Sequence, residues 1–275
     1  MKSDEVDFVA EVGRAGAGLK VDREKVYLIE SRLAPVARRE GFGSIREMLL
    51  AARQRREERL LWAVLEALAS GETSFFRDKA VFTRLREEIL PTLARKRQGE
   101  GPLKIWSAGC ATGQEPYSIA LTVEDCSAVV GASGVDILGT DLSERALEKA
   151  EAGAYSQFEI QRGLPIRQLV RHFEKREDQW TVSAKIRGMV RWKRVNLNGD
   201  FRGLGQFDVI FCRNVLWAME PHASRRLVEQ LAGALAPSGY LILGADETPG
   251  GFGEAFIPRE TGVYEVNPAY QAAAA

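Results

Sequence analysis

Short apolar runs alternate with helical stretches in the second part of this 275-residue chain, from residue 103 onward. Each run has the four to eight residues of a buried strand, and the stretches between them carry helical periodicity. The expected strands are residues 103–108, 135–141, 190–197, 207–214 and 239–246. Strands that alternate with helices form parallel sheets covered on both faces. The pattern predicts a doubly wound α/β domain, whose ligands bind at the carboxyl ends of the strands.

The first part of the chain has a different periodicity. Apolar residues recur there at three- and four-residue steps, which predicts an all-α N-terminal domain over residues 1–95. The polar run 96–102 contains two glycines and a proline and is the expected linker to an α/β domain at 103–275. Within that domain, about residues 160–192 indicate a small inserted antiparallel β-subdomain.

Composition and charge exclude several classes of protein. Apolar residues make up 45% and charged residues 28%, as in an ordinary globular chain with a substantial core. We expect a cytoplasmic protein without membrane insertion, because no run approaches about 20 apolar residues and the start does not resemble a signal peptide. Basic and acidic residues balance at 38 each, so no nucleic-acid partner is expected. The three cysteines lack zinc-site spacing, so we expect no metal.

A glycine-rich turn follows the first expected strand. Gly109 and Gly113 flank this turn, and a helix begins near Pro116. Glycine lets a ligand approach the backbone closely, so both glycines are candidate cofactor-binding residues. The spacing fits neither a Walker A loop nor GxGxxG, which leaves open a tight turn without a ligand.

Two carboxylates suggest which cofactor the turn would bind. Glu115 would repel a pyrophosphate and attract a cation, while Asp141 ends the second expected strand, where a carboxylate accepts from ribose hydroxyls. A ribose and a cation without phosphate describe S-adenosylmethionine (SAM). Simpler roles stay open for both, a helix-dipole carboxylate for Glu115 and an N-cap for Asp141.

Several motifs occur in an order that resembles one family. They are GETSFFRD (71–78), WSAGCATGQEPYSIA (106–120), GTDLS (139–143) and FDVIFCRNVL (207–216). The chain is similar to the CheR family of chemotaxis receptor glutamate O-methyltransferases over about residues 20–266. The resemblance implies a Rossmann-like methyltransferase sheet and transfer of methyl from SAM to glutamate side chains on chemoreceptor cytoplasmic helices, with S-adenosylhomocysteine as the product.

The resemblance also implies roles for individual residues. Thr73 and Arg77 would reach the cofactor from the edge of the N-terminal domain. Asn196 and Leu197 would flank the adenine.

The same resemblance implies that Arg213 and Asn214 close the site near the methionine part of SAM. This chain departs from the family pattern at Gly71, where Asn is usual, and at Ala218 and Met219, where Tyr and Phe are usual. These departures concern the lining of the substrate pocket more than cofactor binding.

The expected reaction makes little demand on acid–base groups. A glutamate carboxylate is ionised at neutral pH, so it needs no general base and the catalytic residues stay unassigned. Arg95 or Arg97 is a candidate to hold the substrate carboxylate, with a solvated junction as the alternative. His172 and His222 lie outside the strand-end motifs and are interpreted as structural.

Four arginines crowd one short segment of the N-terminal domain. Arg53, Arg55, Arg56 and Arg59 would form a docking surface for an acidic receptor, or only a solvated helix face. We expect this helical domain to recognise the receptor. The stretch 173–187 is charged and holds no glycine, unlike the family members that grip a receptor tail peptide there.

Two other functions stay open, and the oligomeric state expected is a monomer. One is a SAM-binding receptor-docking module without catalysis. The other is a methyltransferase that acts on RNA or a small molecule.

Overall fold

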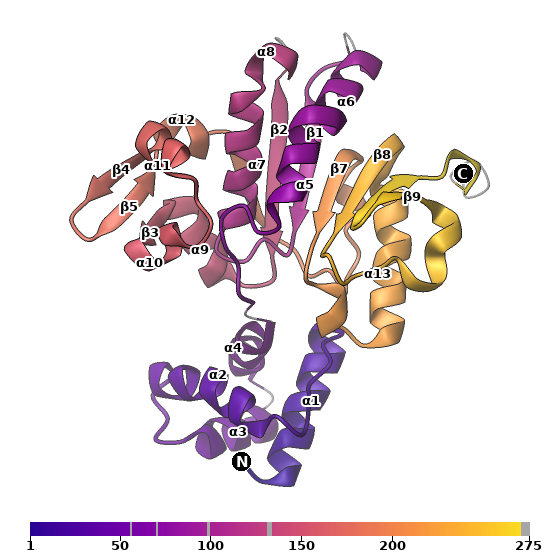
Figure 1. Cartoon of the computed structure of the whole chain (residues 1–275). Helices are drawn as coiled ribbons and strands as arrows, with labels where there is room; N and C mark the ends of the chain where they lie inside the picture. The colour runs from indigo at the N-terminus through magenta and orange to yellow at the C-terminus, as the bar shows by residue number, and fades with distance from the viewer. Residues whose placement is uncertain (56, 70, 98–99, 131–133, 271–275) are drawn as a thin grey trace.

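The computed structural model describes residues 1–55, 57–69, 71–97, 100–130 and 134–270, and Figure 1 shows a helical cluster beneath a larger α/β part. Four helices make the cluster: α1 (Ser3–Ala17), α2 (Val26–Arg39), α3 (Ile45–Arg55) and α4 (Glu58–Ala69). Their apolar stripes bury a separate core that includes Val9, Leu33, Met48 and Leu60. An amphipathic face buried in this way supplies most of the stability of such short helices.

The α/β part is built on a seven-stranded sheet in the order β6-β2-β1-β7-β8-β10-β9. Its strands are β1 (Leu103–Ala108), β2 (Val135–Asp141), β6 (Val190–Arg194), β7 (Phe207–Cys212), β8 (Leu235–Leu243), β9 (Phe256–Glu260) and β10 (Val263–Val266). The first five in spatial order are parallel, whereas β10 is antiparallel to both β8 and β9. Each of the five strands expected from the sequence corresponds to one of these strands. The expected doubly wound, mostly parallel sheet is confirmed.

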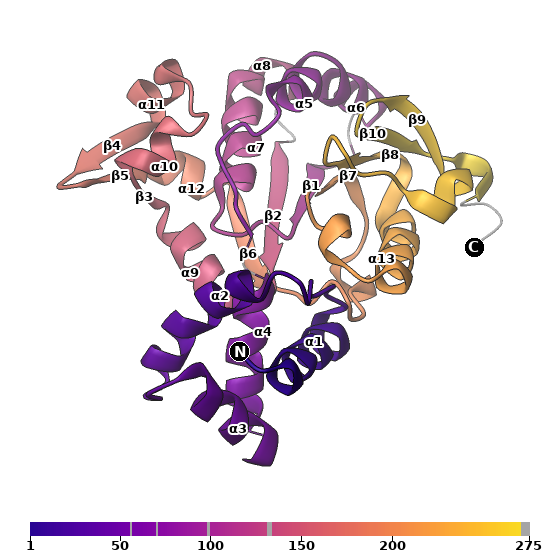
Figure 2. The same ribbon diagram turned by 60° about the horizontal axis from the view of Figure 1, so that its bottom comes forward.

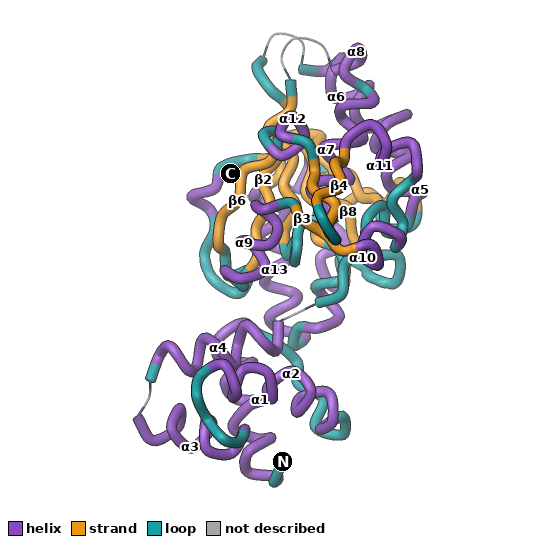
Figure 3. Tube along the Cα trace, turned by 90° about the vertical axis from the view of Figure 1, so that its left-hand side faces the viewer, coloured by secondary structure: helices purple, strands orange, loops and turns teal. Residues whose placement is uncertain are grey.

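Alternate residues of the central strands pack into two different cores, one on each face of the sheet. Ile105 and Val209 pack into one core, and Trp106 and Ile210 pack into the other. This alternation follows from the two-residue period of a strand. Figure 3 shows the sheet between its helical layers. The helices between the main strands are α7 (Gln114–Asp125), α8 (Ser127–Val130), α9 (Glu144–Ala152) and α13 (Pro221–Ala234).

The boundary between the two parts lies between the end of α4 at Ala69 and the start of α5, which differs from the expected linker at 96–102. Residues 98 and 99 of that expected linker lie outside the described residues. The segments α5 (Lys79–Arg84), η1 (Leu85–Ile89) and α6 (Leu90–Lys96) are helical as predicted, but they pack on the sheet. Phe82, Leu85 and Leu93 share a core with Ile105. Periodicity revealed their apolar stripe but not its partner, so residues 79–96 were assigned to the wrong core.

The inserted β-subdomain is present, with bounds that differ from the expected 160–192. It holds β3 (Ala154–Ser156), β4 (Phe173–Arg176) and β5 (Gln179–Val182), paired antiparallel in the order β3-β5-β4. Three short helices accompany these strands: α10 (Gln157–Gln161), α11 (Ile166–His172) and α12 (Ala184–Arg187). Residues 190–192 belong instead to β6 at the edge of the main sheet. In Figure 1 the subdomain projects from the left of the sheet.

Short 3-10 turns complete the chain: η2 (Arg202–Leu204), η3 (Leu216–Ala218) and η4 (Gly250–Ala255). Among the described residues, no helix is both long and apolar enough to span a bilayer. Figure 2 shows the helical cluster in front of the strand ends, with α4 nearest β2 and β6 and α1 nearest α13. This arrangement places the cluster over the end of the sheet where α/β proteins bind ligands.

Candidate active site

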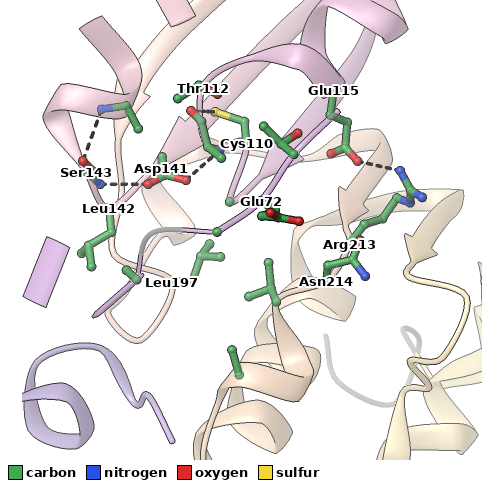
Figure 4. Close-up of a pocket in the computed structure, with 18 of the residues that line it drawn as sticks. Glu72, Cys110, Thr112, Glu115, Asp141, Leu142, Ser143, Leu197, Arg213 and Asn214 are labelled. Atoms are coloured by element: carbon green, nitrogen blue, oxygen red, sulfur yellow. Dashed lines mark hydrogen bonds and ion pairs between the residues drawn. The ribbon is translucent and has the colours of Figure 1, made fainter. Parts of the chain in front are cut away.

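A pocket lies at the carboxyl ends of β1, β2 and β7, between the sheet and the helical cluster. The chain leaves β1 toward β2 on one side and enters β7 on the other, so the pocket lies at the switch point of the sheet. Nine of the ten residues predicted to bind cofactor line it: Thr73, Arg77, Gly109, Glu115, Asp141, Asn196, Leu197, Arg213 and Asn214. Figure 4 shows two groups of polar side chains, one around Asp141 and the other around Arg213.

The glycine turn brings the backbone of the first strand to the pocket. Gly109 has φ +77°, and a Cβ there would meet Val215 Cγ2 at 2.8 Å. Gly113 also has a positive φ, +92°, but it does not line the pocket. A Cβ on Gly113 would meet Ala150 Cβ at 2.7 Å, so this glycine allows α7 to begin against α9. The sequence reasoning gave both glycines the same role, whereas the structure separates them.

Asp141 ends β2 with both carboxylate oxygens already accepting backbone hydrogen bonds. Oδ2 accepts from Ala111 N–H at 2.8 Å, and Oδ1 accepts from Ser143 N–H at 2.9 Å. Burial raises the pKa of Asp141, although these N–H groups act in the opposite direction. Ser143, rather than Asp141, is the N-cap of α9, and its hydroxyl accepts from Ala146 N–H at 3.2 Å. Asp141 is thus held in place and keeps further lone pairs for hydroxyl donors.

Both carboxylate oxygens of Glu115 already have partners within the protein. Its Oε1 accepts from Ser107 Oγ at 2.7 Å, and its Oε2 pairs with Arg213 Nη1 at 3.0 Å. The expected attraction of Glu115 for a cation stays a prediction, and the structure adds that Glu115 shares Arg213 with Asp78. The charge of Glu115 is compensated by a side chain 98 residues away, which the sequence could not place beside it.

Arg213 connects Glu115 to the segment that precedes α5. Its Nη2 pairs with Asp78 and donates to the Arg77 carbonyl at 2.9 Å. The side chain is 2% exposed, and its Nε has no hydrogen-bond partner among the described residues. An unpartnered buried donor beside the pocket suits an anionic group of a ligand.

The helical cluster covers the pocket through a few contacts at each side. Near α1, Leu19 pairs with Met219 as an isolated antiparallel bridge, and Lys20 N–H donates to the Ala218 carbonyl at 2.8 Å. Asn196 Nδ2 donates to the Gly16 carbonyl at 2.7 Å, so this side chain ties the sheet to α1 as well as lining the pocket.

On the other side of the pocket, α4 meets the start of α9 and the end of β6. Glu144 N–H donates to Glu66 Oε1 at 2.9 Å, and Glu144 pairs with Arg194 at 3.3 Å. The Arg194 guanidinium lies 5.4 Å from the centre of the Trp62 ring. Residues from both parts of the chain therefore enclose one site.

Several lining residues were missed by the sequence reasoning. They are Ala17, Leu19, Ala69, Glu72, Leu142 and Ser143 among others. Leu142 and Ser143 follow Asp141 directly, so proximity to a strand-end carboxylate was a usable signal. Ala17 and Leu19 carried no signal, because only the tertiary arrangement brings the end of α1 to the strand ends.

The two candidates for holding the substrate carboxylate do not lie at the pocket. Arg97 Nη1 donates to Asp208 Oδ1 at 2.6 Å, and Lys104 N–H donates to Asp208 Oδ2 at 2.7 Å. This pair joins the amino ends of β1 and β7, opposite the pocket. Arg95 is exposed in the last turn of α6. The assignment of Arg95 or Arg97 to the substrate is corrected, because the pocket lies at the carboxyl ends of the strands, a full strand length from these arginines.

Of the four arginines in this segment, the structure describes the side chains of Arg53 and Arg59. Arg53 lines a groove between α1, α3 and α4, with its guanidinium 5.9 Å from the Phe8 ring centre. Arg59 pairs with Glu40, and with Glu57 at 3.4 Å. Arg56 and the side chain of Arg55 lie outside the described residues.

No described thiol or imidazole at the pocket is suited to nucleophilic or general-base work. Burial raises the pKa of Cys110 well above its usual value, and the carboxylates of Asp141 and Glu115 act in the same direction. Cys110 is therefore a protonated thiol at neutral pH. His172 is buried in the β-subdomain and His222 lies in α13, and neither lines the pocket.

The residues present fit S-adenosylmethionine. Asp141 suits the ribose hydroxyls, and the apolar side chains of Leu142 and Leu197 suit a purine ring. Arg213 and Asn214 line the pocket on the side away from Asp141, which leaves that side for the amino-acid part (Figure 4). Arg77 and Arg213 are the basic side chains among the described residues that line the pocket, and Arg213 is already paired.

A nucleoside with a cationic amino-acid tail matches such a pocket better than a pyrophosphate does, and on a doubly wound sheet this defines a SAM-dependent methyltransferase. Over residues 71–263 the sequence matches the family described as "CheR methyltransferase, SAM binding domain". The chain belongs to this family, as its motifs indicated.

Curated relatives match over most of the chain. Chemotaxis protein methyltransferase 1 of Pseudomonas aeruginosa is 36% identical over 234 residues, 84% of this chain and 85% of the relative. The chemotaxis protein methyltransferase of Vibrio parahaemolyticus is 36% identical over 87% of both chains. Chemotaxis protein methyltransferase Cher2 of Pseudomonas putida is 34% identical over 85% of this chain and 86% of the relative.

Proposed function

We propose that this enzyme methylates glutamate side chains on the cytoplasmic helices of chemoreceptors, giving glutamyl methyl esters. SAM supplies a methyl group bound to a sulfonium. The observation that carries the proposal is the pocket itself, where a ribose-accepting carboxylate and a buried arginine line one cavity and no described histidine lines it. A carboxylate substrate needs no base, because it is ionised at neutral pH.

The pocket residues would orient and shield the reactants. Asp141 would accept from the ribose hydroxyls, Asn196 and Leu197 would flank the adenine, and Arg213 with Asn214 would hold the methionine part. One new carbon–oxygen bond forms as the carbon–sulfur bond breaks, and no proton moves. Orientation and exclusion of water can lower such a barrier by about 7 to 11 kcal/mol.

Arg77 is the better candidate for holding the substrate carboxylate. It is exposed, lines the pocket, and forms no ion pair with any described residue. Its Nη1 donates only to the Glu72 carbonyl, at 3.1 Å. This role would replace the cofactor contact expected from the resemblance, and Thr73, which also lines the pocket, would contact the cofactor.

The helical domain would recognise the receptor. The β4–β5 hairpin turns at Glu177, with φ +53°, and Asp178, and it lacks the glycine of tail-binding relatives. In the helical domain, Arg53 beside the α1–α4 groove offers a cation to an acidic helix. We also propose that the enzyme acts as a cytoplasmic monomer.

A labelling experiment tests the function. Incubation of the protein with radiolabelled SAM and cell membranes containing chemoreceptors should label the receptors, and mild base should release the label as methanol. Membranes whose receptors carry Gln at the methylated positions are the matched control. Absence of base-labile label, with SAM bound normally, would exclude glutamate methylation.

A second experiment tests the docking surface. Replacement of Arg53, Arg55, Arg56 and Arg59 by Ala should slow methylation and leave SAM affinity unchanged. The wild-type rate should fall as salt rises, since exposed charges are screened over about 8 Å at physiological ionic strength. Equal rates for the two proteins would identify a solvated helix face.

One observation favours a non-catalytic alternative. Ala218 and Met219 line the pocket at the positions where relatives have Tyr and Phe, so aromatic contacts to the reactants are missing. A SAM-binding docking module would bind SAM and receptor without product formation. Single-turnover measurement of methyl transfer separates it from the enzyme.

A further inference from the structure

A buried carboxylate behind the pocket joins the ends of two neighbouring strands. Glu247 follows β8 and is 6% exposed. Its Oε2 accepts hydrogen bonds from the backbone N–H groups of Asn214 at 2.7 Å and Gly244 at 2.9 Å. Its Oε1 accepts from Trp217 N–H at 3.3 Å. One side chain therefore fixes the turn 214–217 after β7 against the end of β8.

The turn held by Glu247 needs such support. Asn214 has φ +60°, a left-handed conformation that residues other than glycine adopt infrequently. Conformations of this kind persist when the surrounding contacts determine them. Three backbone donors converge on the Glu247 carboxylate, and no cation among the described residues forms an ion pair with it. Loss of this acceptor would leave buried N–H groups unsatisfied.

The Glu247 carboxylate leaves no room for a side chain at position 244. A Cβ on Gly244 would lie 2.8 Å from Glu247 Oε2 and 2.9 Å from Asn214 Nδ2. Both contacts are shorter than van der Waals distances. A glycine at this position therefore allows the end of β8, the carboxylate and the turn to approach one another.

The same turn forms part of the pocket wall. Asn214, Val215 and Ala218 line the pocket, whereas Glu247 does not. Ala218 follows this turn directly, and its carbonyl accepts from Lys20 N–H of the helical cluster at 2.8 Å. A shift of this turn would move the wall beside the methionine part of SAM and the contact with α1 together.

We propose that Glu247 is a positioning residue for methyl transfer: its carboxylate sets the turn 214–217, and the turn sets the pocket wall. This role rests on the function proposed above. It predicts effects on SAM binding and turnover from a side chain that touches neither reactant.

The test compares Glu247→Gln with Asp246→Asn, an exposed neighbour. The Gln amide would keep one acceptor oxygen and place an NH2 donor where the other oxygen accepts from backbone N–H. We expect Glu247→Gln to weaken SAM binding and lower kcat by about tenfold or more, as for other buried hydrogen bonds to charged groups. KM for the receptor should stay within twofold of wild type, and amide exchange in residues 213–219 should accelerate. Asp246→Asn should match wild type throughout.

A second variant approaches the same contact from the opposite side. Gly244→Ala should reproduce the loss of SAM affinity, whereas Gly233→Ala, where an added Cβ meets nothing within 4 Å, should not. Because both changes displace one contact, the double variant Gly244→Ala/Glu247→Gln should lose less than the sum of the single losses.

A folded Glu247→Gln protein with SAM affinity and kcat within twofold of wild type would overturn the proposal. A lowered melting temperature with unchanged kinetics would do the same, because it would show a purely structural role. SAM affinity and amide exchange are measured without receptor. Failure of the wild-type protein to methylate receptors would therefore count against the proposed function and leave this test intact.

Discussion

The strand-end side of the pocket and the side formed by the helical domain hold their residues in different ways. At the strand ends, Asp141, Glu115 and Arg213 each make several hydrogen bonds or ion pairs and are largely buried. The helical domain contributes Ala17, Leu19 and Ala69, whose side chains are apolar, and it is attached by a few contacts. The strand-end side is thus built to bind one small molecule in a fixed position.

The largest effect should come from removal of the buried cation on the strand-end side. Arg213→Ala leaves Glu115 and Asp78 without their partner, and a broken buried pair costs about 3–5 kcal/mol of unfolding free energy. The comparator is Arg194→Ala, whose exposed ion pair with Glu144 lies next to Trp62 of the helical cluster and should contribute about 0.2–1 kcal/mol. Chemical denaturation measures both values. Equal losses would break the contrast between the two sides.

Cofactor affinity should depend on the strand-end carboxylate. Asp141→Ala removes an acceptor from the ribose and should weaken SAM binding by about 1.5–3 kcal/mol, measured by calorimetry. Leu19→Ala on the helical side should have a smaller effect. Asp136→Ala, on the same strand and paired with Arg191 away from the pocket, is the matched control. Unchanged affinity in Asp141→Ala would remove Asp141 from the site.

The pH dependence of SAM binding also tests whether Asp141 binds the ribose. Burial raises the pKa of Asp141, and the ionised form is the better acceptor for two hydroxyls. SAM affinity should therefore fall as pH drops through this raised value, by about tenfold for each pH unit below it.

The free energy of unfolding of the unliganded protein should change with pH in the opposite direction, because of the same raised pKa of Asp141. A raised folded-state pKa favours the protonated form, so the contribution of Asp141 is complete below its unfolded-state pKa. That contribution is lost as pH rises through the folded-state value. Asp141→Asn should flatten both profiles, and titrations in which the variant and wild type coincide would contradict this assignment.

The smallest effect concerns the β-subdomain. If the helical domain recognises the receptor, deletion of the last few residues of the cognate receptor should change the methylation rate by less than about twofold. The charged turn at Glu177 and Asp178 gives a tail peptide poor access to the strand edge. A large loss of rate, together with binding of the isolated tail peptide, would transfer recognition to the β-subdomain.

The sequence alone determined the five parallel strands of the sheet and the residues at their ends. Buried strands are local apolar runs, and a ligand-binding turn follows its strand directly, so Gly109 and Asp141 could be found by position. The motifs then identified the family. Thr73, Asn196 and Arg213 also reach the pocket as the resemblance implied.

Only the tertiary structure decided which partners these residues meet. Residues 79–96 pack on the sheet, Arg97 pairs with Asp208 at the opposite end, and Arg213 neutralises Glu115. The two ion pairs join residues that are far apart in the chain. The apolar stripe of residues 79–96 could have packed on the helical cluster or on the sheet. Local periodicity describes a face that must be buried but contains no information on what buries it, and that choice depends on the packing of the whole molecule.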